Sequence, residues 1–344
     1  MGKNTNVNNL SSAPVFLYGS GRSGTTWLEE RIAGALHAEV IFEPLQERLH
    51  AIANTYGFRY LAACENHPEL QAYFQKLIMG DLKYFWTRYR ILPNRLVPTV
   101  QTFSNTGPFK AWLKRFPEAF SLMTKYRSTL NRPRKIIKLI RANLMIGWMI
   151  KAFPVSLHIA IVRHPAAVIE SRMRLDRVAQ SVGGLKGAND WNAENLLNKY
   201  LQHPLPKDLK KSIRDVGPME DLNLYERHCV LWCIENKLLF DNKSIVSQLI
   251  CYEDLIDKNN QAWSNLADTI NVVESKLKQG MEKPSQQSSK LNNLHQYRPS
   301  HSPIEKLKFI QGASCIHRLQ DYLDLFCIKY YRADSLLPEH HFEN

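Results

Sequence analysis

The chain has 344 residues, of which 44% are hydrophobic, and it carries a formal net charge of +13 at pH 7. This length and apolar content suffice for one large globular domain, and the basic balance favours anionic ligands. The composition excludes a membrane-spanning helix, because the longest apolar stretch, residues 136–162, is interrupted by Lys138, Arg141 and Lys151.

The first residues of the chain contain no apolar core suited to a signal peptide or an anchor. We therefore predict a disordered tail over residues 1–12, one domain over residues 13–332 and a C-terminal tail over residues 333–344, in a cytoplasmic, bacterial protein. The cysteines include no C-x-x-C pair, so we expect reduced core thiols and no metal site. They are Cys64, Cys229, Cys233, Cys251, Cys315 and Cys327.

Residues 14–19 have the pattern of a strand, and a glycine-rich turn and an amphipathic helical pattern follow them. Gly19, Gly21 and Gly24 let the backbone turn its amides toward a ligand, and Thr25 and Thr26 supply hydroxyl groups. The new helix adds N–H groups and the positive end of its dipole. The segment predicts a phosphate-binding loop.

Three classes of phosphate compound fit this loop. The spacing of the glycines matches a Walker loop with Thr26 at the magnesium-binding position, but Thr25 occupies the place of the required lysine. The same three glycines match the G-x-G-x-x-G fingerprint, and Glu43 lies at the distance of a ribose-binding acid, so an NAD(P)-dependent Rossmann oxidoreductase is the alternative hypothesis. Arg22 inside the turn and Trp27 at the helix start suit a charged clamp on phosphate better than a loop that lets pyrophosphate approach bare backbone.

A second segment predicts another oxyanion site. Residues 157–162 form a buried type of apolar strand that ends at Arg163. Pro165 suits the first position of a helix, and Ser171 lies two turns into that helix. The guanidinium and the hydroxyl together can bind an anion.

Residues 38–42, 135–140 and 245–251 have the patterns of further strands, separated by helical patterns. This alternation predicts an α/β three-layer sandwich with a central parallel sheet. Ligands in such sheets bind beyond the carboxyl ends of the strands. We therefore expect five segments to converge on one edge, namely residues 19–27, Glu43, Arg141, Arg163 and Tyr252.

Positive charge is concentrated between Lys76 and Arg141, a segment that contains fifteen Lys or Arg residues and only two acidic residues. Most of this segment belongs to an insertion of about residues 45–134, which we predict to be mainly helical. It forms either a solvated basic face or a wall of an acceptor groove that attracts an anionic substrate. No nucleic-acid-binding module accompanies the charge, so nucleic acid is not an expected partner. Residues 281–303 have the composition of a flexible loop.

At this point the chain resembles the sulfotransferases that use 3′-phosphoadenosine 5′-phosphosulfate (PAPS), which have a P-loop-like fold. Residues 22–27 resemble the family's 5′-phosphosulfate loop, and Arg163 with Ser171 resembles its 3′-phosphate pair. The sequence Phe-Glu-Pro at residues 42–44 resembles a segment of carbohydrate sulfotransferases, and residues 135–141 resemble the Lys-x-x-Arg pattern of the same group. His164 and Ala166 depart from the family pattern.

The resemblance implies that the chain is an enzyme that moves a sulfuryl group from PAPS to an acceptor hydroxyl on a saccharide or glycolipid. It assigns the donor to Gly21, Arg22, Ser23, Gly24, Thr25, Thr26, Trp27, Arg163 and Ser171. Within this set, Arg22 would stabilise the transferring group and Trp27 would cover one face of the adenine.

Glu43 would then be the base that takes the acceptor proton. Lys138 and Arg141 either orient an anionic substrate or form salt bridges at the strand end. By the same resemblance, Tyr297 and Arg298 belong to a loop that closes over the donor. The arginines and the helix N-terminus already supply positive charge, so no metal is required.

Overall fold

The computed structural model describes residues 13–47, 49–82, 87–88, 134–181, 192–257, 261–279 and 302–339. The expected tail over residues 1–12, most of the basic insertion and residues 281–301 of the expected loop, including Tyr297 and Arg298, lie outside the described residues. Residues 302 and 303 of that loop are described and begin a helix. None of the helices in the described part of the chain has the length and apolar character needed to cross a bilayer.

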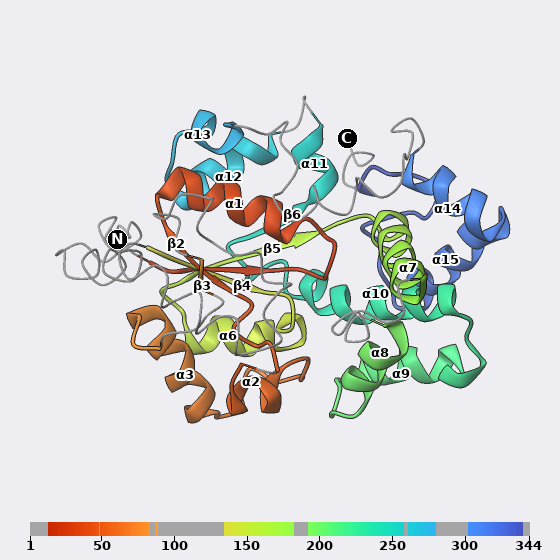
Figure 1. Ribbon diagram of the computed structural model, residues 1–344, viewed down its shortest axis with the longest axis horizontal. Helices are drawn as coiled ribbons and strands as arrows, with labels where there is room; N and C mark the ends of the chain where they lie inside the picture. Colours follow the sequence, from red (N-terminus) through yellow and green to blue (C-terminus); the bar gives the residue numbers. More distant parts are fainter. Residues whose placement is uncertain are drawn as a thin grey trace, which may run out of the picture.

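A six-stranded sheet in the order β3-β2-β4-β1-β5-β6 forms the centre of the protein (Figure 1). The strands are β1 (Val15–Tyr18), β2 (Glu39–Phe42), β3 (Thr87–Arg88), β4 (Lys135–Leu139), β5 (Leu157–Val162) and β6 (Gln248–Cys251). Five of them are parallel, and only β3 pairs antiparallel, with β2. The predicted α/β class and the five predicted parallel strands are confirmed, whereas β3 lies in the insertion that we expected to be mainly helical.

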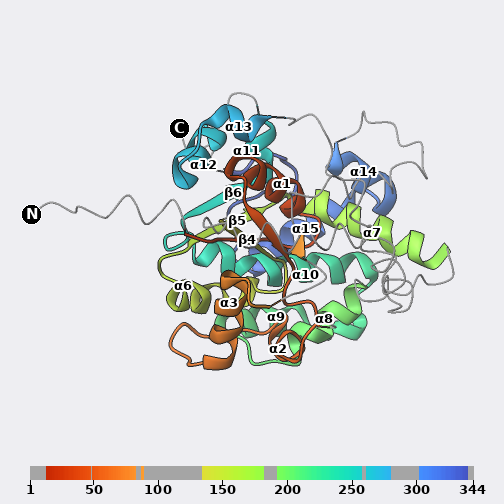
Figure 2. The same ribbon diagram turned by 60° about the vertical axis from the view of Figure 1, so that its left-hand side comes forward.

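Helices cover both faces of the sheet, which gives the three-layer arrangement expected from the sequence. The helices are α1 (Thr25–Leu36), α2 (Ala51–Tyr56), α3 (Pro68–Met79), α6 (Ile146–Ala152), α7 (Pro165–Ser181), α8 (Ala193–Leu201), α9 (Lys207–Val216), α10 (Leu224–Asp241), α11 (Tyr252–Ile256), α12 (Ala262–Ile270), α13 (Glu274–Lys278), α14 (Pro303–Gln311) and α15 (Ser314–Leu325), with 3-10 turns η3 (Asn143–Met145) and η5 (Met219–Asp221). Helices α1, α12 and α13 lie on one face, and α2, α3 and α6 on the other (Figure 1). Helices α7, α10, α14 and α15 gather beyond the end of β5, where Figure 2 shows α7 next to α14.

The strands divide their side chains between two hydrophobic cores, as the period of two in a β-strand requires. Phe16 and Tyr18 of β1 pack in the core that includes α6 and α10. Val15 and Leu17 pack in the core that includes α1 and α12. Each parallel strand is therefore buried on both faces, which explains its nearly continuous apolar sequence.

The strand order separates this fold from the Rossmann arrangement. In a Rossmann sheet the second parallel strand lies beside the first. Here β4 lies between β1 and β2, and Glu43, which follows β2, is thereby separated from the strand that leads into the glycine loop. The alternative hypothesis of an NAD(P)-dependent oxidoreductase requires the other order, so the topology opposes it.

His164 departs from the family pattern and acts as the N-cap of α7. Its Nδ1 accepts a hydrogen bond from the backbone N–H of Ala166 at 3.2 Å, which is the contact an Asp or Asn cap would make. Its Nε2–H donates to the backbone oxygen of Arg332 at 2.9 Å. Burial lowers the pKa of His164 to about 4, so the ring is neutral near pH 7.

The C-terminal segment packs against this cap. Glu253 accepts hydrogen bonds from the His164 backbone N–H at 3.0 Å and from the Tyr331 hydroxyl at 2.7 Å. Ala333, which the sequence analysis placed in a tail, is buried, and the described chain continues to residue 339. The ordered structure thus extends past our expected domain end.

Four of the six cysteines lie in the core, as expected, and all six are free. Cys64 and Cys327 are exposed, so the expectation of a core thiol is wrong for these two.

Replacing His164 with Asn should flatten the dependence of stability on pH, because Asn retains a cap acceptor but does not titrate. As the pH falls below 6.5, the unfolded chain binds a proton on this histidine, whereas the folded chain does so only near pH 4. This difference removes up to about 3 kcal/mol of stability between pH 7 and pH 4. Urea unfolding at several pH values should show that His164→Asn loses about that much less stability than the wild type over this range.

The exposed His317 on α15 offers a matched control, and His317→Asn should follow the wild-type curve. A His164→Asn variant that loses as much stability on acidification as the wild type would contradict this account.

Candidate active site

The glycine-rich loop between β1 and α1 has a backbone of alternating handedness. Arg22 (φ 76°) and Gly24 (φ 94°) are left-handed on either side of Ser23. The hydroxyl and the backbone N–H of Ser23 both donate hydrogen bonds to the backbone oxygen of Ser20, at 2.7 and 3.2 Å. Successive residues of this kind direct their N–H groups into one concave surface that binds anions.

Two glycines of the loop are required by close contacts. A Cβ at Gly19 would lie 2.6 Å from the backbone oxygen of Ile161, and a Cβ at Gly24 would lie 2.6 Å from Cδ2 of Tyr252. Gly24 is also the N-cap of α1 and provides no side-chain acceptor for the first turn. Because the first N–H groups of a helix have no intrahelical acceptor, this end of α1 favours an anion.

Two arginines bind the carbonyl oxygens of the loop. Arg172 Nη2 donates to the Gly21 oxygen at 3.0 Å, and Arg163 Nη1 lies 3.5 Å from the Arg22 oxygen. The carbonyl oxygens of Gly21 and Arg22 therefore face these arginines. Sequence analysis did not identify Arg172, because no local pattern indicates that its side chain reaches back to residue 21.

The two predicted anion sites are in direct contact. Arg22 Nε donates to Ser171 Oγ at 2.9 Å, although 149 positions separate these residues in the chain. Partial burial, followed by the positive charges of Arg174, Arg163 and Arg172, lowers the pKa of Arg22 to about 10. The charge of Glu170 opposes part of this effect, and Arg172 is paired with Glu235.

Arg163 itself has an unused donor. Its Nε is buried and has no hydrogen-bond partner among the described residues. Its guanidinium lies 4.5 Å from the centre of the Tyr252 ring, and that ring in turn contacts the ring of Trp27 edge-on. A buried donor without an acceptor is costly, and an anionic ligand oxygen would satisfy it.

Trp27 lies mostly inside the core. Its side chain is 8% exposed and packs edge-on against Trp263 as well as Tyr252. The sequence analysis assigned one face of the adenine to Trp27. In the structure little of Trp27 is exposed, and the ring of Tyr252 also lies beside the loop.

Glu43 lies at the centre of a second cluster. Lys138 Nζ is 3.1 Å from Oε1 of Glu43, and Arg141 Nη1 is 2.6 Å from its Oε2. Burial alone would raise the pKa of Glu43, but the charges and hydrogen bonds of Lys138 and Arg141 outweigh it and hold the pKa below its usual value. Glu43 is therefore an ionised carboxylate, and it lines a small hollow with Leu45, Leu139, Ile140 and Arg141.

Lys138 joins the two clusters, because its Nζ also donates to Thr26 Oγ1 at 2.7 Å. The carboxylate of Glu43 is thus one side chain away from the first turn of α1. The five segments that the sequence placed at one edge of the sheet do converge there. Within the described part of the chain, His, Cys, Asp and Glu side chains form no group of three or more able to hold a metal ion.

Comparisons with known proteins give a family and a set of similar structures. A model described as "Sulfotransferase family" matches residues 14–206. Among solved structures, the chain is similar to a sulfotransferase domain from the curacin biosynthetic pathway (17% identity, 87% of this chain and 96% of that chain covered, TM-score 0.37). It is also similar to a sulfotransferase domain from the Synechococcus PCC 7002 olefin synthase (17% identity, coverage 91% and 94%, TM-score 0.41). A third similar structure is a sulfotransferase from Alicyclobacillus acidocaldarius (11% identity, coverage 91% and 96%, TM-score 0.36). Comparison with curated proteins found no match.

The close approach of Tyr252 to Gly24 can be tested by a double-mutant cycle. Gly24→Ala should cost about 1–2 kcal/mol for the left-handed backbone and about 1–3 kcal/mol more for crowding against Tyr252. In a Tyr252→Ala background, only the backbone cost should remain. Urea unfolding of the four proteins measures this coupling, and an equal cost of Gly24→Ala in both backgrounds would show that the loop does not pack against this ring.

Proposed function

Because the chain belongs to the sulfotransferase family, we propose that it transfers the sulfuryl group of PAPS to an acceptor hydroxyl. The observation that carries the proposal is the hydrogen bond between Arg22 and Ser171, which makes one site of two separate anion-binding segments. A nucleotide with a phosphate at each end of its ribose matches such a double site.

The residues fit the two phosphate groups of this donor. The amides of Gly24, Thr25 and Thr26 at the start of α1 would hold the 5′-phosphate, with Gly21 and Ser23 shaping the turn. The buried Nε of Arg163 and the hydroxyl of Ser171 would hold the 3′-phosphate.

Ser171 Oγ accepts from Arg22, so its own hydroxyl proton stays available to donate. We assign the adenine to the exposed edge of Trp27 together with the ring of Tyr252.

PAPS supplies an activated sulfuryl group, and the protein has to align it and stabilise oxygens that gain charge. Arg22 is suited to this role, because its guanidinium lies beside the loop and is repelled by Arg163, Arg172 and Arg174. An anion between these groups lowers that repulsion, and it can draw Arg22 away from Ser171 toward the transferring group.

Glu43 is our candidate for the base. Its carboxylate stays ionised, and its side chain is 13% exposed just past the carboxyl end of β2. Lys138 and Arg141 both contact Glu43, so we propose that they orient it and that Lys138 ties it to the donor loop through Thr26.

A saccharide or glycolipid hydroxyl is the proposed acceptor, on the basis of the Phe-Glu-Pro segment that ends β2. The proposal includes no metal, since the arginines and the N-terminus of α1 provide the positive charge. A cytoplasmic location stays a prediction of the sequence.

Adenosine 3′,5′-bisphosphate should stabilise the protein in a thermal-shift assay without any divalent cation, and NAD should not. Ser171→Ala should weaken the bisphosphate more than adenosine 5′-monophosphate, because it removes a 3′-phosphate contact. Arg163→Ala should weaken both ligands, because Arg163 Nη1 also lies 3.5 Å from the Arg22 oxygen of the loop. Stabilisation by NAD with none by the bisphosphate would contradict the proposed function.

Glu43→Gln should lower the turnover of a donor labelled in its sulfuryl group by about 10²- to 10⁴-fold, the usual contribution of a general base. The affinity for adenosine 3′,5′-bisphosphate should stay near that of the wild type. Glu47, which pairs with Lys199 at 2.7 Å, offers a control, and Glu47→Gln should retain turnover. Transfer to a panel of saccharides and glycolipids is the readout, and full activity of Glu43→Gln would exclude this carboxylate as the base.

A further inference from the structure

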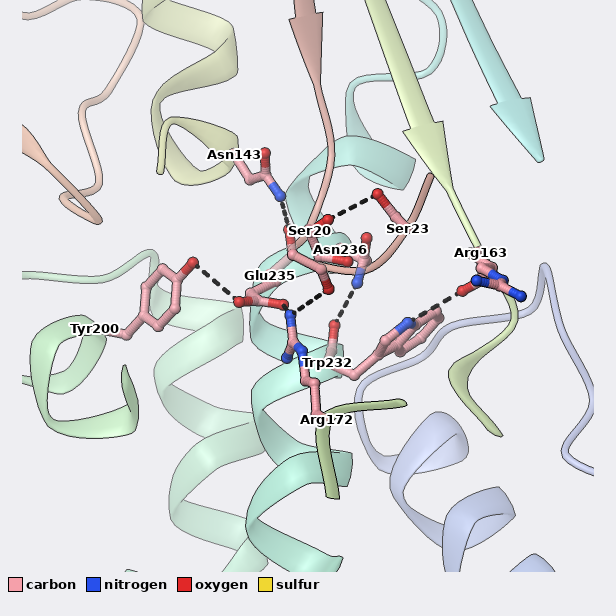
Figure 3. Close-up of polar contacts among 10 residues, drawn as sticks. Ser20, Ser23, Asn143, Arg163, Arg172, Tyr200, Trp232, Glu235 and Asn236 are labelled. Carbon is pink, nitrogen blue, oxygen red and sulfur yellow. Dashed lines mark hydrogen bonds and ion pairs between the residues drawn. The ribbon is translucent and has the colours of Figure 1, made fainter. Parts of the chain in front are cut away.

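A set of buried polar side chains on α10 lies directly behind the anion site (Figure 3). Glu235 is 2% exposed, and Trp232 and Asn236 are fully buried. Helix α10 packs against α7, the helix that carries Ser171. None of these α10 residues matches a motif of the sequence analysis.

Glu235 supports the glycine-rich loop through Arg172. Its Oε2 accepts a hydrogen bond from Arg172 Nη2 at 2.6 Å, and the same nitrogen donates to the Gly21 oxygen at 3.0 Å. Both partners of this ion pair are buried, at 5% and 3% side-chain exposure. Removal of one partner of such a pair leaves an uncompensated buried charge, so we expect loss of Glu235 to displace Arg172 from the Gly21 oxygen.

Trp232 supports the second anion site. Its indole Nε1–H donates to the backbone oxygen of Arg163 at 3.1 Å (Figure 3). The backbone of α10 is itself fixed at both residues, because Asn236 Nδ2 donates to the Trp232 oxygen at 2.7 Å and Asn143 Nδ2 donates to the Glu235 oxygen at 3.1 Å.

Trp232 and Glu235 are three residues apart and therefore lie on the same side of α10. One rigid helix thus holds the loop through Glu235 and Arg172, and it holds Arg163 through Trp232. The spacing between the two anion sites follows from the spacing between two side chains of one helix.

We propose that Glu235 and Trp232 are positioning residues that set the distance between the 5′-phosphate and 3′-phosphate sites. The inference rests on the proposed function, since it assumes one nucleotide that reaches both sites. The two phosphates of such a nucleotide are held at a nearly fixed separation by its ribose. A misplacement of about 1 Å between the sites is expected to weaken binding strongly.

The test compares two ligands, adenosine 3′,5′-bisphosphate and adenosine 5′-monophosphate, by calorimetric titration. Glu235→Leu loosens the loop that both ligands use, so it should weaken both ligands by the same factor, up to about 100-fold. Glu235→Gln keeps a hydrogen-bond acceptor for Arg172, so its affinity for both ligands should lie between those of Glu235→Leu and the wild type. Trp232→Phe removes the donor to the backbone of Arg163, whose side chain lies 3.5 Å from the Arg22 oxygen and contributes little to the loop, so it should weaken the bisphosphate more than the monophosphate.

Two variants control for loss of stability alone. Lys135 and Glu39 form a largely buried ion pair between the amino ends of β4 and β2, far along the strands from the site, and Glu39→Leu breaks it. Trp148 donates its indole N–H to the backbone oxygen of Glu65, and Trp148→Phe removes that donor. Both controls should lower the thermal midpoint yet bind the two ligands as the wild type does.

The outcomes separate this inference from the proposed function. A wild-type protein with no preference for the bisphosphate over the monophosphate would contradict the proposed function, and this inference with it. If the wild type prefers the bisphosphate, two results would contradict the positioning role and leave the proposed function intact. Either Trp232→Phe weakens both ligands alike, or Glu235→Leu weakens neither.

Discussion

The site depends on hydrogen bonds that arginines of another segment make to the carbonyl oxygens of the glycine-rich loop. Arg172 binds the Gly21 oxygen, and Arg163 approaches the Arg22 oxygen. A loop with left-handed residues on both sides of Ser23 has N–H groups on its opposite side. Without the arginines, neither the conformation of the loop nor its distance from α7 would be fixed. The anion site on the loop would then have no fixed position relative to the second anion site at Arg163 and Ser171.

The charges of the site are arranged unequally. On the loop side, burial and then the positive charges of three neighbouring arginines lower the pKa of Arg22. On the other side, the carboxylate of Glu43 is paired with both Lys138 and Arg141. The first arrangement favours an incoming anion, whereas the second holds an ionised carboxylate in place. Lys138 connects the two, because its Nζ contacts both Thr26 in the first turn of α1 and the carboxylate of Glu43.

The sequence predicted features that local patterns determine. The five parallel strands, the start of α7 at Pro165 and the loop before α1 follow from apolar runs, glycines and a proline, and all appear in the structure. The order of the strands does not follow from such patterns, and only the order separates this fold from the Rossmann arrangement. The roles of Arg172, Trp232 and Glu235 depend on contacts between distant segments, so nothing in their neighbouring residues could indicate them. His164 departs from the family pattern, yet it makes the same cap contact through an imidazole nitrogen.

The central claim is that Arg22 to Thr26 and Arg163 with Ser171 form a single site for one doubly phosphorylated adenosine. A crystal structure of the protein with adenosine 3′,5′-bisphosphate tests it most directly. We predict the 5′-phosphate on the backbone N–H groups at the start of α1 and the 3′-phosphate of the same molecule on Arg163 and Ser171. A bisphosphate that reaches only one of these groups, or that binds elsewhere on the protein, would contradict the account.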